Sequence, residues 1–149
     1  MRAVVQRVNS ALVEIGGKKE SEIKKGLLVL LGISEEDDEK DIKYLVEKLV
    51  NLRIFEDDYE KMNLSLLDIK GELLIVSQFT LYGDCRKGRR PNFMKAAKPS
   101  IAEDLYEKFI DICLEYNIKV GSGKFGEDMQ VKLTNDGPVT ILLDSKKNF

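Results

Sequence analysis

The polar residues that follow an apolar run near the middle of the chain are the first candidates for chemistry. Residues 77–84 read Ser-Gln-Phe-Thr-Leu-Tyr-Gly-Asp and come directly after the apolar residues 73–76. A buried strand that ends in hydroxyls, an amide and free backbone N–H groups is a suitable floor for a reaction. Ser and Thr at a strand end also commonly satisfy backbone groups, so this segment alone leaves both interpretations open.

A second candidate lies near the end of the chain, where residues 135–140 read Asn-Asp-Gly-Pro-Val-Thr. Pro138 has no backbone N–H to donate, and Gly137 can adopt backbone conformations that other residues avoid. Only about 5–6% of X-Pro bonds in folded proteins are cis, so an ordinary trans turn is the default interpretation. The spacing of these residues does not by itself identify a site.

The absence of histidine from all 149 residues restricts the chemistry. It excludes Ser-His-Asp and Cys-His catalysis and every zinc site that contains histidine. The two cysteines, Cys85 and Cys113, are far apart in the sequence, so we expect no metal and no cofactor. Cys113 fits an apolar helix face, and Cys85 has no acid–base partner to activate it. Hydrolysis by this chain would have to rely on positioning, backbone donors, carboxylates or groups of the substrate.

Charged residues offer two weaker candidates. Residues 86–91 read Arg-Lys-Gly-Arg-Arg-Pro, and the four charges from Arg86 to Arg90 would suit the phosphates of an RNA. A solvated surface loop explains the same residues equally well. Asp136 and Asp144 could pair as an acid and a base, although aspartates at turns and strand ends are commoner.

The composition is that of one folded domain, residues 1–149, with 43% hydrophobic and 34% charged residues. A chain of this length buries roughly 70% of its unfolded surface, which is enough for a core without disulfide bonds. The formal charge of -2 means that any contact with nucleic acid must come from a local patch. The longest apolar run, residues 27–31, is far shorter than the roughly 20 residues that span a bilayer. With no apolar leader after Met1 and few cysteines, we expect a cytoplasmic protein that does not enter a membrane.

Hydrophobic periodicity predicts most of a sheet. Residues 4–15 alternate apolar with other side chains, and Gly16 and Gly17 can supply the positive φ of a hairpin turn before residues 18–23. The continuous apolar runs 27–31 and 73–76 are typical of central strands buried on both faces. Further strands are predicted at residues 52–55, 120–125, 129–135 and 139–144.

Two helices are predicted, at residues 38–51 and 100–117, because apolar residues recur three and four apart in both segments. Acidic residues near Asp38 favour the start of the first helix, and Ser100 and Glu103 have the spacing of a capping box at the second. Together these elements predict a mixed α/β fold, in which a curved, barrel-like sheet carries both helices on one side.

Four blocks of the sequence, taken in order, resemble the D-aminoacyl-tRNA deacylase family, also called the D-tyrosyl-tRNA deacylase family. They are MRAVVQRV at residues 1–8, SQFTLYGD at 77–84, GKFGEDMQV at 123–131 and NDGPVT at 135–140. The resemblance extends over essentially the whole chain. It implies an enzyme that hydrolyses the ester between a D-amino acid and the 3′ end of tRNA, and that also cleaves mischarged glycyl-tRNA.

The resemblance also assigns site residues. It implies a homodimer in which a cis peptide bond between Gly137 and Pro138 reaches into the partner's active site and excludes L-amino acids, with Arg7 holding that element in place. The pocket around the scissile ester would be formed by Ser77, Gln78, Phe79 and Thr80, with Phe125 and Met129 helping to line it. These four are the candidate catalytic residues, and Thr80 is the natural candidate for a nucleophile. The family is, however, understood to use the RNA's own terminal 2′-hydroxyl with backbone groups, which agrees with the missing histidine base.

Two rival functions remain open. A non-catalytic RNA-binding module would explain the basic loop, although it leaves the two polar blocks unexplained. A related editing deacylase that prefers L-alanine on a mismatched tRNA would share most of the chain, and a trans bond between Gly137 and Pro138 would distinguish it.

Overall fold

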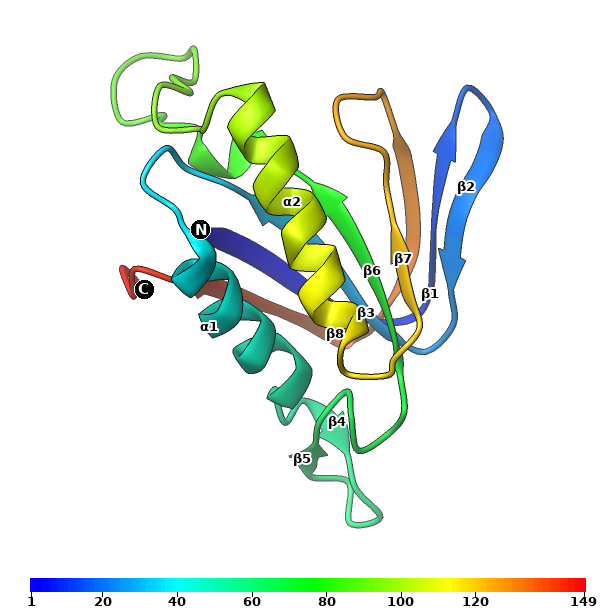
Figure 1. Cartoon of the computed structure of the whole chain (residues 1–149). Coiled ribbons are helices and arrows are strands. Elements are labelled where there is room, and N and C mark those ends of the chain that lie inside the picture. The colour runs from blue at the N-terminus through cyan, green and yellow to red at the C-terminus, as the bar shows by residue number, and fades with distance from the viewer.

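The sheet is organised around one long strand, β1 (Arg2–Ile15), which is hydrogen-bonded along both edges (Figure 1). The computed structural model describes residues 1–149. On one edge, β3 (Gly26–Gly32) pairs antiparallel with residues 2–8 of β1, and β2 (Lys18–Ile23) pairs with residues 11–15. On the other edge, β8 (Gln130–Asp144) runs antiparallel along nearly the whole of β1.

The two apolar runs form the central strands that their sequence predicts. β6 (Glu72–Ser77) lies parallel to β3, and β7 (Val120–Ser122) lies parallel to β6. Successive side chains of these strands alternate between two separate hydrophobic clusters, so that Leu27 faces the helices and Leu28 faces the opposite side. A strand covered on both faces has no position for a polar side chain, which explains its continuous apolar sequence.

Both helices pack on one face of the sheet, as predicted (Figure 1). In α1 (Glu39–Asn51), Asp38 accepts a hydrogen bond from the N–H of Asp41, whose side chain accepts one from the N–H of Asp38. The predicted cap at Ser100 is wrong, because α2 (Pro99–Leu114) begins one residue earlier and has no side-chain cap. Proline suits the first helical turn, where its missing N–H would have no acceptor.

The opposite face of the sheet is closed by its own curvature. The hairpin of β1 and β2 bends until β2 approaches β6 and β7. Val8, Val13, Ile23 and Leu28 pack there in a second core. The curved, barrel-like sheet with two helices on one side is therefore confirmed. Neither helix has the length and apolar character needed to cross a bilayer.

Four predicted strands differ in extent from the structure. The strands predicted at residues 129–135 and 139–144 form the single strand β8, which begins at Gln130, because its pairing with β1 resumes after residues 136–139. The strand predicted at residues 52–55 shrinks to β4 (Phe55–Glu56), which pairs only with β5 (Met62–Leu64) in a small separate sheet. The predicted strand 120–125 ends at Ser122, and the chain then leaves the sheet toward the site described next.

Candidate active site

A pocket of about 680 Å³ opens where β6 ends. It lies between the last residues of β3 and β6, the first turn of α2 and the segment that connects β7 to β8, and apolar side chains form most of its lining. Five of the residues predicted for the site line this pocket: Ser77, Gln78, Phe79, Phe125 and Met129. The fold thus brings together two of the sequence blocks that lie far apart along the chain.

The floor of the pocket is the start of a 3-10 helix, η1 (Phe79–Tyr82). Gln78 N donates to Leu31 O at 2.7 Å, which fixes the beginning of this turn to the end of β3. The hydrogen bonds of the turn begin with Leu81 N and Gln78 O at 3.3 Å, so the N–H groups of Phe79 and Thr80 have no acceptor within it. Both residues are exposed, and their N–H groups are candidates to bind an oxygen atom of a ligand.

Thr80 lies at the edge of the pocket and is not part of its lining. Its hydroxyl oxygen accepts a hydrogen bond from the side-chain amide of Gln78, and it has no contact with a basic group. Lys98 and Glu127 are the only ionisable side chains in the lining, and both are exposed. Because a nucleophilic hydroxyl needs a base within hydrogen-bonding distance, this geometry does not favour Thr80 as a nucleophile.

Two aromatic residues that the sequence did not single out support the walls. The ring of Phe93 packs edge-on against Phe79, with the ring centroids 5.1 Å apart. Tyr106 of α2 packs against Phe125 at 5.9 Å, and its hydroxyl donates to Ile75 O at 2.8 Å. Burial raises the pKa of Tyr106, so its hydroxyl stays protonated and acts as a donor. The sequence does contain a signal for Tyr106, because a tyrosine on the apolar face of a predicted helix must find a hydrogen-bond partner for its hydroxyl. Phe93 lies in a segment without hydrophobic periodicity, so no such signal points to it.

Gly137 and Pro138 lie outside this pocket, in a bulge of β8. The pairing of β1 with β8 omits residues 136–139, which stand opposite Arg7 alone. The peptide bond between Gly137 and Pro138 is cis, and both residues are exposed. Gly137 has a φ of 130°, a conformation that side-chain-bearing residues rarely adopt.

Arg7 holds the bulge from beneath. Its side chain is only 6% exposed, and its Nε donates to Asp136 O at 3.0 Å and lies 3.2 Å from the carboxylate of the same residue. Its Nη1 donates to Ile54 O at 2.7 Å. The side chain of Asn135 closes the top of the bulge by accepting from Val139 N at 2.8 Å. Short contacts therefore fix both ends of the exposed segment.

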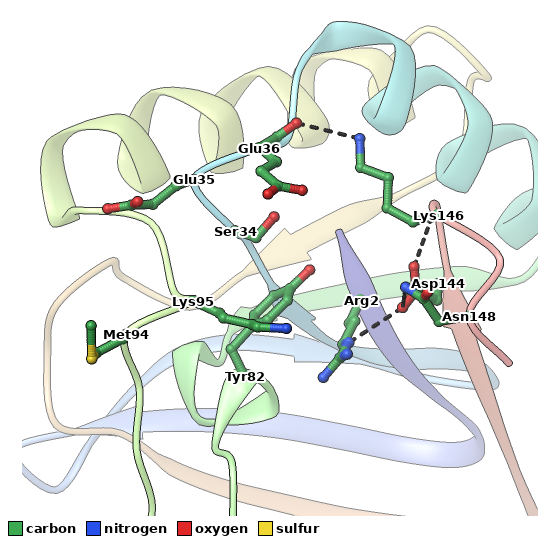
Figure 2. Close-up of a pocket in the computed structure, with 10 residues that line it drawn as sticks. All are labelled: Arg2, Ser34, Glu35, Glu36, Tyr82, Met94, Lys95, Asp144, Lys146 and Asn148. Carbon is green, nitrogen blue, oxygen red and sulfur yellow. Dashed lines mark hydrogen bonds and ion pairs between the residues drawn. The ribbon is translucent and has the colours of Figure 1, made fainter.

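Asp136 and Asp144 do not form the acid–base pair considered from the sequence. Asp136 pairs with Arg7, and Asp144 lies 3.3 Å from Arg2 Nε (Figure 2). The two arginines are five residues apart on β1, which corresponds to about 17 Å along a strand. Each carboxylate therefore has its own cationic partner.

The basic loop after η1 is exposed throughout. Arg86 donates to both carboxylate oxygens of Asp84, and these hydrogen bonds hold the pKa of Asp84 well below its usual range. Lys87, Arg89 and Arg90 form no ion pair within the chain. These three charges are therefore free to meet a polyanion, although they do not line the pocket.

The cysteines have no part in the pocket. Cys113 lies on the buried face of α2, and burial raises its pKa to about 12, whereas Cys85 is exposed. No group of three or more cysteine, aspartate or glutamate side chains is arranged to hold a metal ion.

Comparisons with known proteins agree on one family. The sequence profile described as D-Tyr-tRNA(Tyr) deacylase matches residues 4–144. The chain is 65% identical to the D-aminoacyl-tRNA deacylase of Thermosipho africanus (strain TCF52B) and 63% identical to that of Natranaerobius thermophilus (strain ATCC BAA-1301 / DSM 18059 / JW/NM-WN-LF), in both cases over 100% of each chain.

Solved structures show the same fold. The structure titled c-Myc DNA Unwinding Element Binding Protein matches with a TM-score of 0.91 and 44% identity, covering 97% of this chain and 98% of the other. A probable eukaryotic D-amino acid tRNA deacylase matches with a TM-score of 0.81 at 19% identity, covering 95% and 97% of the two chains. The second likeness concerns the fold alone.

Proposed function

Because this chain belongs to the D-Tyr-tRNA(Tyr) deacylase family, we propose that it removes D-amino acids from tRNA by hydrolysing the ester at the terminal ribose. As a member of that family it is an enzyme, a hydrolase of D-aminoacyl-tRNA. The observation that carries the detailed proposal is the pocket at the end of β6, with the N–H groups of Phe79 and Thr80 at its floor. Such an activity would serve as proofreading in translation and would take place in the cytoplasm.

The pocket suits the aminoacylated end of an RNA. Its volume of about 680 Å³ lies within the usual range for small-ligand sites, and its lining is mostly apolar. The rings of Phe79, Phe93 and Phe125 offer flat surfaces on which an adenine base can stack. The lining contains one lysine and one glutamate, so the pocket itself attracts no polyanion, and the phosphates of the RNA would stay outside.

The proposed chemistry uses the substrate in place of a side-chain base. Water adds to the ester carbonyl, and the N–H groups of Phe79 and Thr80 stabilise the oxyanion that forms. The bond to the ribose 3′-oxygen then breaks, and the vicinal 2′-hydroxyl passes its proton to this leaving oxygen while its own oxygen takes up the proton that the attacking water loses. The position of Thr80, whose hydroxyl contacts only the amide of Gln78, supports a role in positioning.

A second copy of the chain is proposed to complete each pocket. Gly137 and Pro138 are exposed and lie outside the pocket of their own chain, and Arg7 and Asn135 fix their conformation. The outer edge of β8 has no partner strand, and Leu142 on it is 57% exposed. An unpaired edge with exposed apolar side chains supports a symmetric contact between two copies.

Chirality would then be decided by backbone atoms. If the carbonyl groups of Gly137 and Pro138 hold the substrate's α-amino group, a D side chain points away from them and an L side chain collides with them. Rejection of this kind does not depend on the identity of the side chain. Glycine has no side chain to collide, so glycyl-tRNA would escape rejection.

The deciding experiment compares four substrates under identical conditions: D-Tyr-tRNA, D-Asp-tRNA, L-Tyr-tRNA and Gly-tRNA. We expect hydrolysis of both D substrates and of glycyl-tRNA, while L-Tyr-tRNA persists. Comparable cleavage of L-Tyr-tRNA, or complete inertness of glycyl-tRNA on every tRNA tried, would show that the pocket is not a steric chiral filter.

The mechanism has its own test. Thr80→Ala should retain substantial activity, whereas D-Tyr-tRNA that ends in 2′-deoxyadenosine should be a very poor substrate. A dead Thr80→Ala enzyme together with normal cleavage of the deoxy substrate would identify Thr80 as the nucleophile. Sedimentation of the active enzyme tests the dimer, since a fully active monomer would contradict the shared site.

The two rival functions are separated by related assays. The structural relative with 44% identity is named for binding a DNA element, which makes nucleic-acid binding without hydrolysis the main alternative. That alternative requires tight RNA binding with no release of amino acid from any of the four substrates. Adding L-Ala on a mismatched tRNA to the panel tests the other alternative, in which this substrate would be hydrolysed faster than D-Tyr-tRNA.

A further inference from the structure

A second cleft, of about 470 Å³, lies near the pocket at the end of β6, which we call the reaction pocket. Arg2 at the start of β1, Tyr82 at the end of η1, Asp84, Arg86 and Lys95 contribute to its lining. The two cavities share the segment of residues 93–98, which lines the reaction pocket with Phe93 and Ala96 and this cleft with Lys95. The segment of residues 93–98 therefore separates the reaction pocket from this cleft.

Positive charge is concentrated in this cleft. Its lining has three cationic side chains and one carboxylate, that of Asp84, which Arg86 already binds. The reaction pocket carries one lysine and one glutamate. A smaller cavity shares Arg2, Tyr82 and Lys95 with this cleft and is balanced, because it also contains three carboxylates and one further lysine: Glu35, Glu36, Asp144 and Lys146 (Figure 2). Of these three cavities, this cleft alone has an excess of positive charge.

Arg2 is held in position before any ligand arrives. Its Nη1 donates to Leu81 O at 3.0 Å, its Nε lies 3.3 Å from the carboxylate of Asp144, and its guanidinium stacks 4.7 Å from the centre of the Tyr82 ring. Its Nη2 makes no hydrogen bond within the chain. Lys95, from a different segment, also has no hydrogen-bonding or ionic partner in the chain (Figure 2). A fixed guanidinium beside a free ammonium is a suitable pair of donors for a phosphate group.

We propose that this cleft binds a backbone phosphate of the substrate RNA's 3′ strand between Arg2 and Lys95, and that this contact holds the aminoacylated nucleotide in the neighbouring pocket. The proposal rests on the proposed function, since it takes the RNA to be the substrate. With the terminal nucleoside in the reaction pocket, whose charges balance, the phosphodiester on its 5′ side would emerge at the mouth, next to residues 93–98. Phosphate contacts fix register without reading sequence, which suits an enzyme that must accept many tRNAs.

The test compares two substrates that differ in their phosphates: D-Tyr-tRNA and 3′-O-(D-tyrosyl)adenosine, which has none. Lys95→Gln should raise KM for D-Tyr-tRNA about two- to fivefold, as expected for an exposed ion pair. Arg2→Gln should raise it about tenfold, as expected for loss of charged hydrogen bonds, and Arg2→Lys less than that. For both positions we expect kcat on D-Tyr-tRNA and cleavage of the adenosine ester to change little. The slope of log(kcat/KM) against log salt should become shallower by about 0.7 for one lost phosphate contact.

Lys43→Gln is the matched control, because Lys43 is an exposed lysine of α1 with no ion pair. If Lys95→Gln and Arg2→Gln behave like Lys43→Gln on D-Tyr-tRNA, the phosphate site is wrong although the deacylase function stands. Equal losses on both substrates would likewise overturn it, since they would indicate damage to the reaction pocket. If the wild-type enzyme cleaves neither substrate, the proposed function itself fails, and this inference fails with it.

Discussion

Replacing Arg7 with alanine should both destabilise the fold and impair deacylation. The guanidinium is nearly buried and donates to two backbone carbonyl groups, those of Ile54 and Asp136. Its loss leaves these two acceptors without a donor, at about 1–3 kcal/mol each, and also breaks the ion pair with the Asp136 carboxylate. Because Asp136 is partly reached by solvent, we expect a total loss of about 3–5 kcal/mol in the free energy of unfolding.

Thermal and urea unfolding measure this loss directly. For a chain of this length, about 2–4 °C of Tm corresponds to 1 kcal/mol, so the Arg7→Ala variant should melt roughly 6–20 °C lower. Arg7→Lys should be intermediate, since an ammonium reaches fewer acceptors than a guanidinium. Arg53→Ala is the matched control, because Arg53 also donates to a backbone carbonyl, that of Asn63, but is exposed.

Deacylation of D-Tyr-tRNA must be assayed at a temperature where every variant remains folded. The proposed role of Arg7 in presenting Gly137 and Pro138 predicts a large loss of activity for Arg7→Ala and little loss for Arg53→Ala. An Arg7→Ala protein that is as stable as Arg53→Ala and fully active would refute both the energetic reasoning and the role of the bulge.

Three further predictions concern the bulge, acid stability and metals. Gly137→Ala should lose stability and activity, because the added Cβ would lie 2.8 Å from Val139 Cγ2 and the residue has a φ of 130°. The control is Gly88→Ala, since Gly88 also has a positive φ but has open space around it. This control should show only a small decrease in Tm and should keep its activity. Burial opposes ionisation of Asp41, but hydrogen bonds from Ser145 and Lys146 outweigh it and lower its pKa to about 2. Its contribution to stability should therefore be complete above about pH 4 and disappear as the pH falls through 2, so the difference between wild type and Asp41→Asn in urea unfolding should shrink over that interval. Deacylation should persist after thorough treatment with EDTA, and activity that is lost there and restored by zinc would show that a metal takes part.

The strands and helices that follow a local rule could be predicted from the sequence. Residues 27–31 and 73–76 are apolar without interruption because both of their faces are buried, and this pattern identified β3 and β6. Gly16 and Gly17 have the positive φ expected of the hairpin turn. In each of these elements, the property that fixes the structure lies within a few consecutive residues.

Features that depend on distant contacts could not be predicted from periodicity or spacing. Pro138 cannot donate to a ladder and therefore predicts a break between two strands, but β8 pairs with β1 on both sides of the bulge. The bulge depends on Arg7, more than a hundred residues away in the sequence. The wall at Phe93 comes from a segment without periodicity, whose place beside β3 is set by Ala97 N donating to Ile33 O.

The pairing of β1 with β8 also bears on how a newly made chain reaches this state. β1 is synthesised first and can pair with β2 and β3 as soon as these strands have been made. Its second edge has no partner until β8, near the end of the chain, has been synthesised. Contacts between such distant segments form slowly, and an open strand edge can pair with another unfinished chain. Nascent copies on one messenger would therefore be at risk of mispairing through β1. Because β8 also carries Gly137 and Pro138, a ribosome that stops before this strand would release a chain without the two residues proposed to exclude L-amino acids.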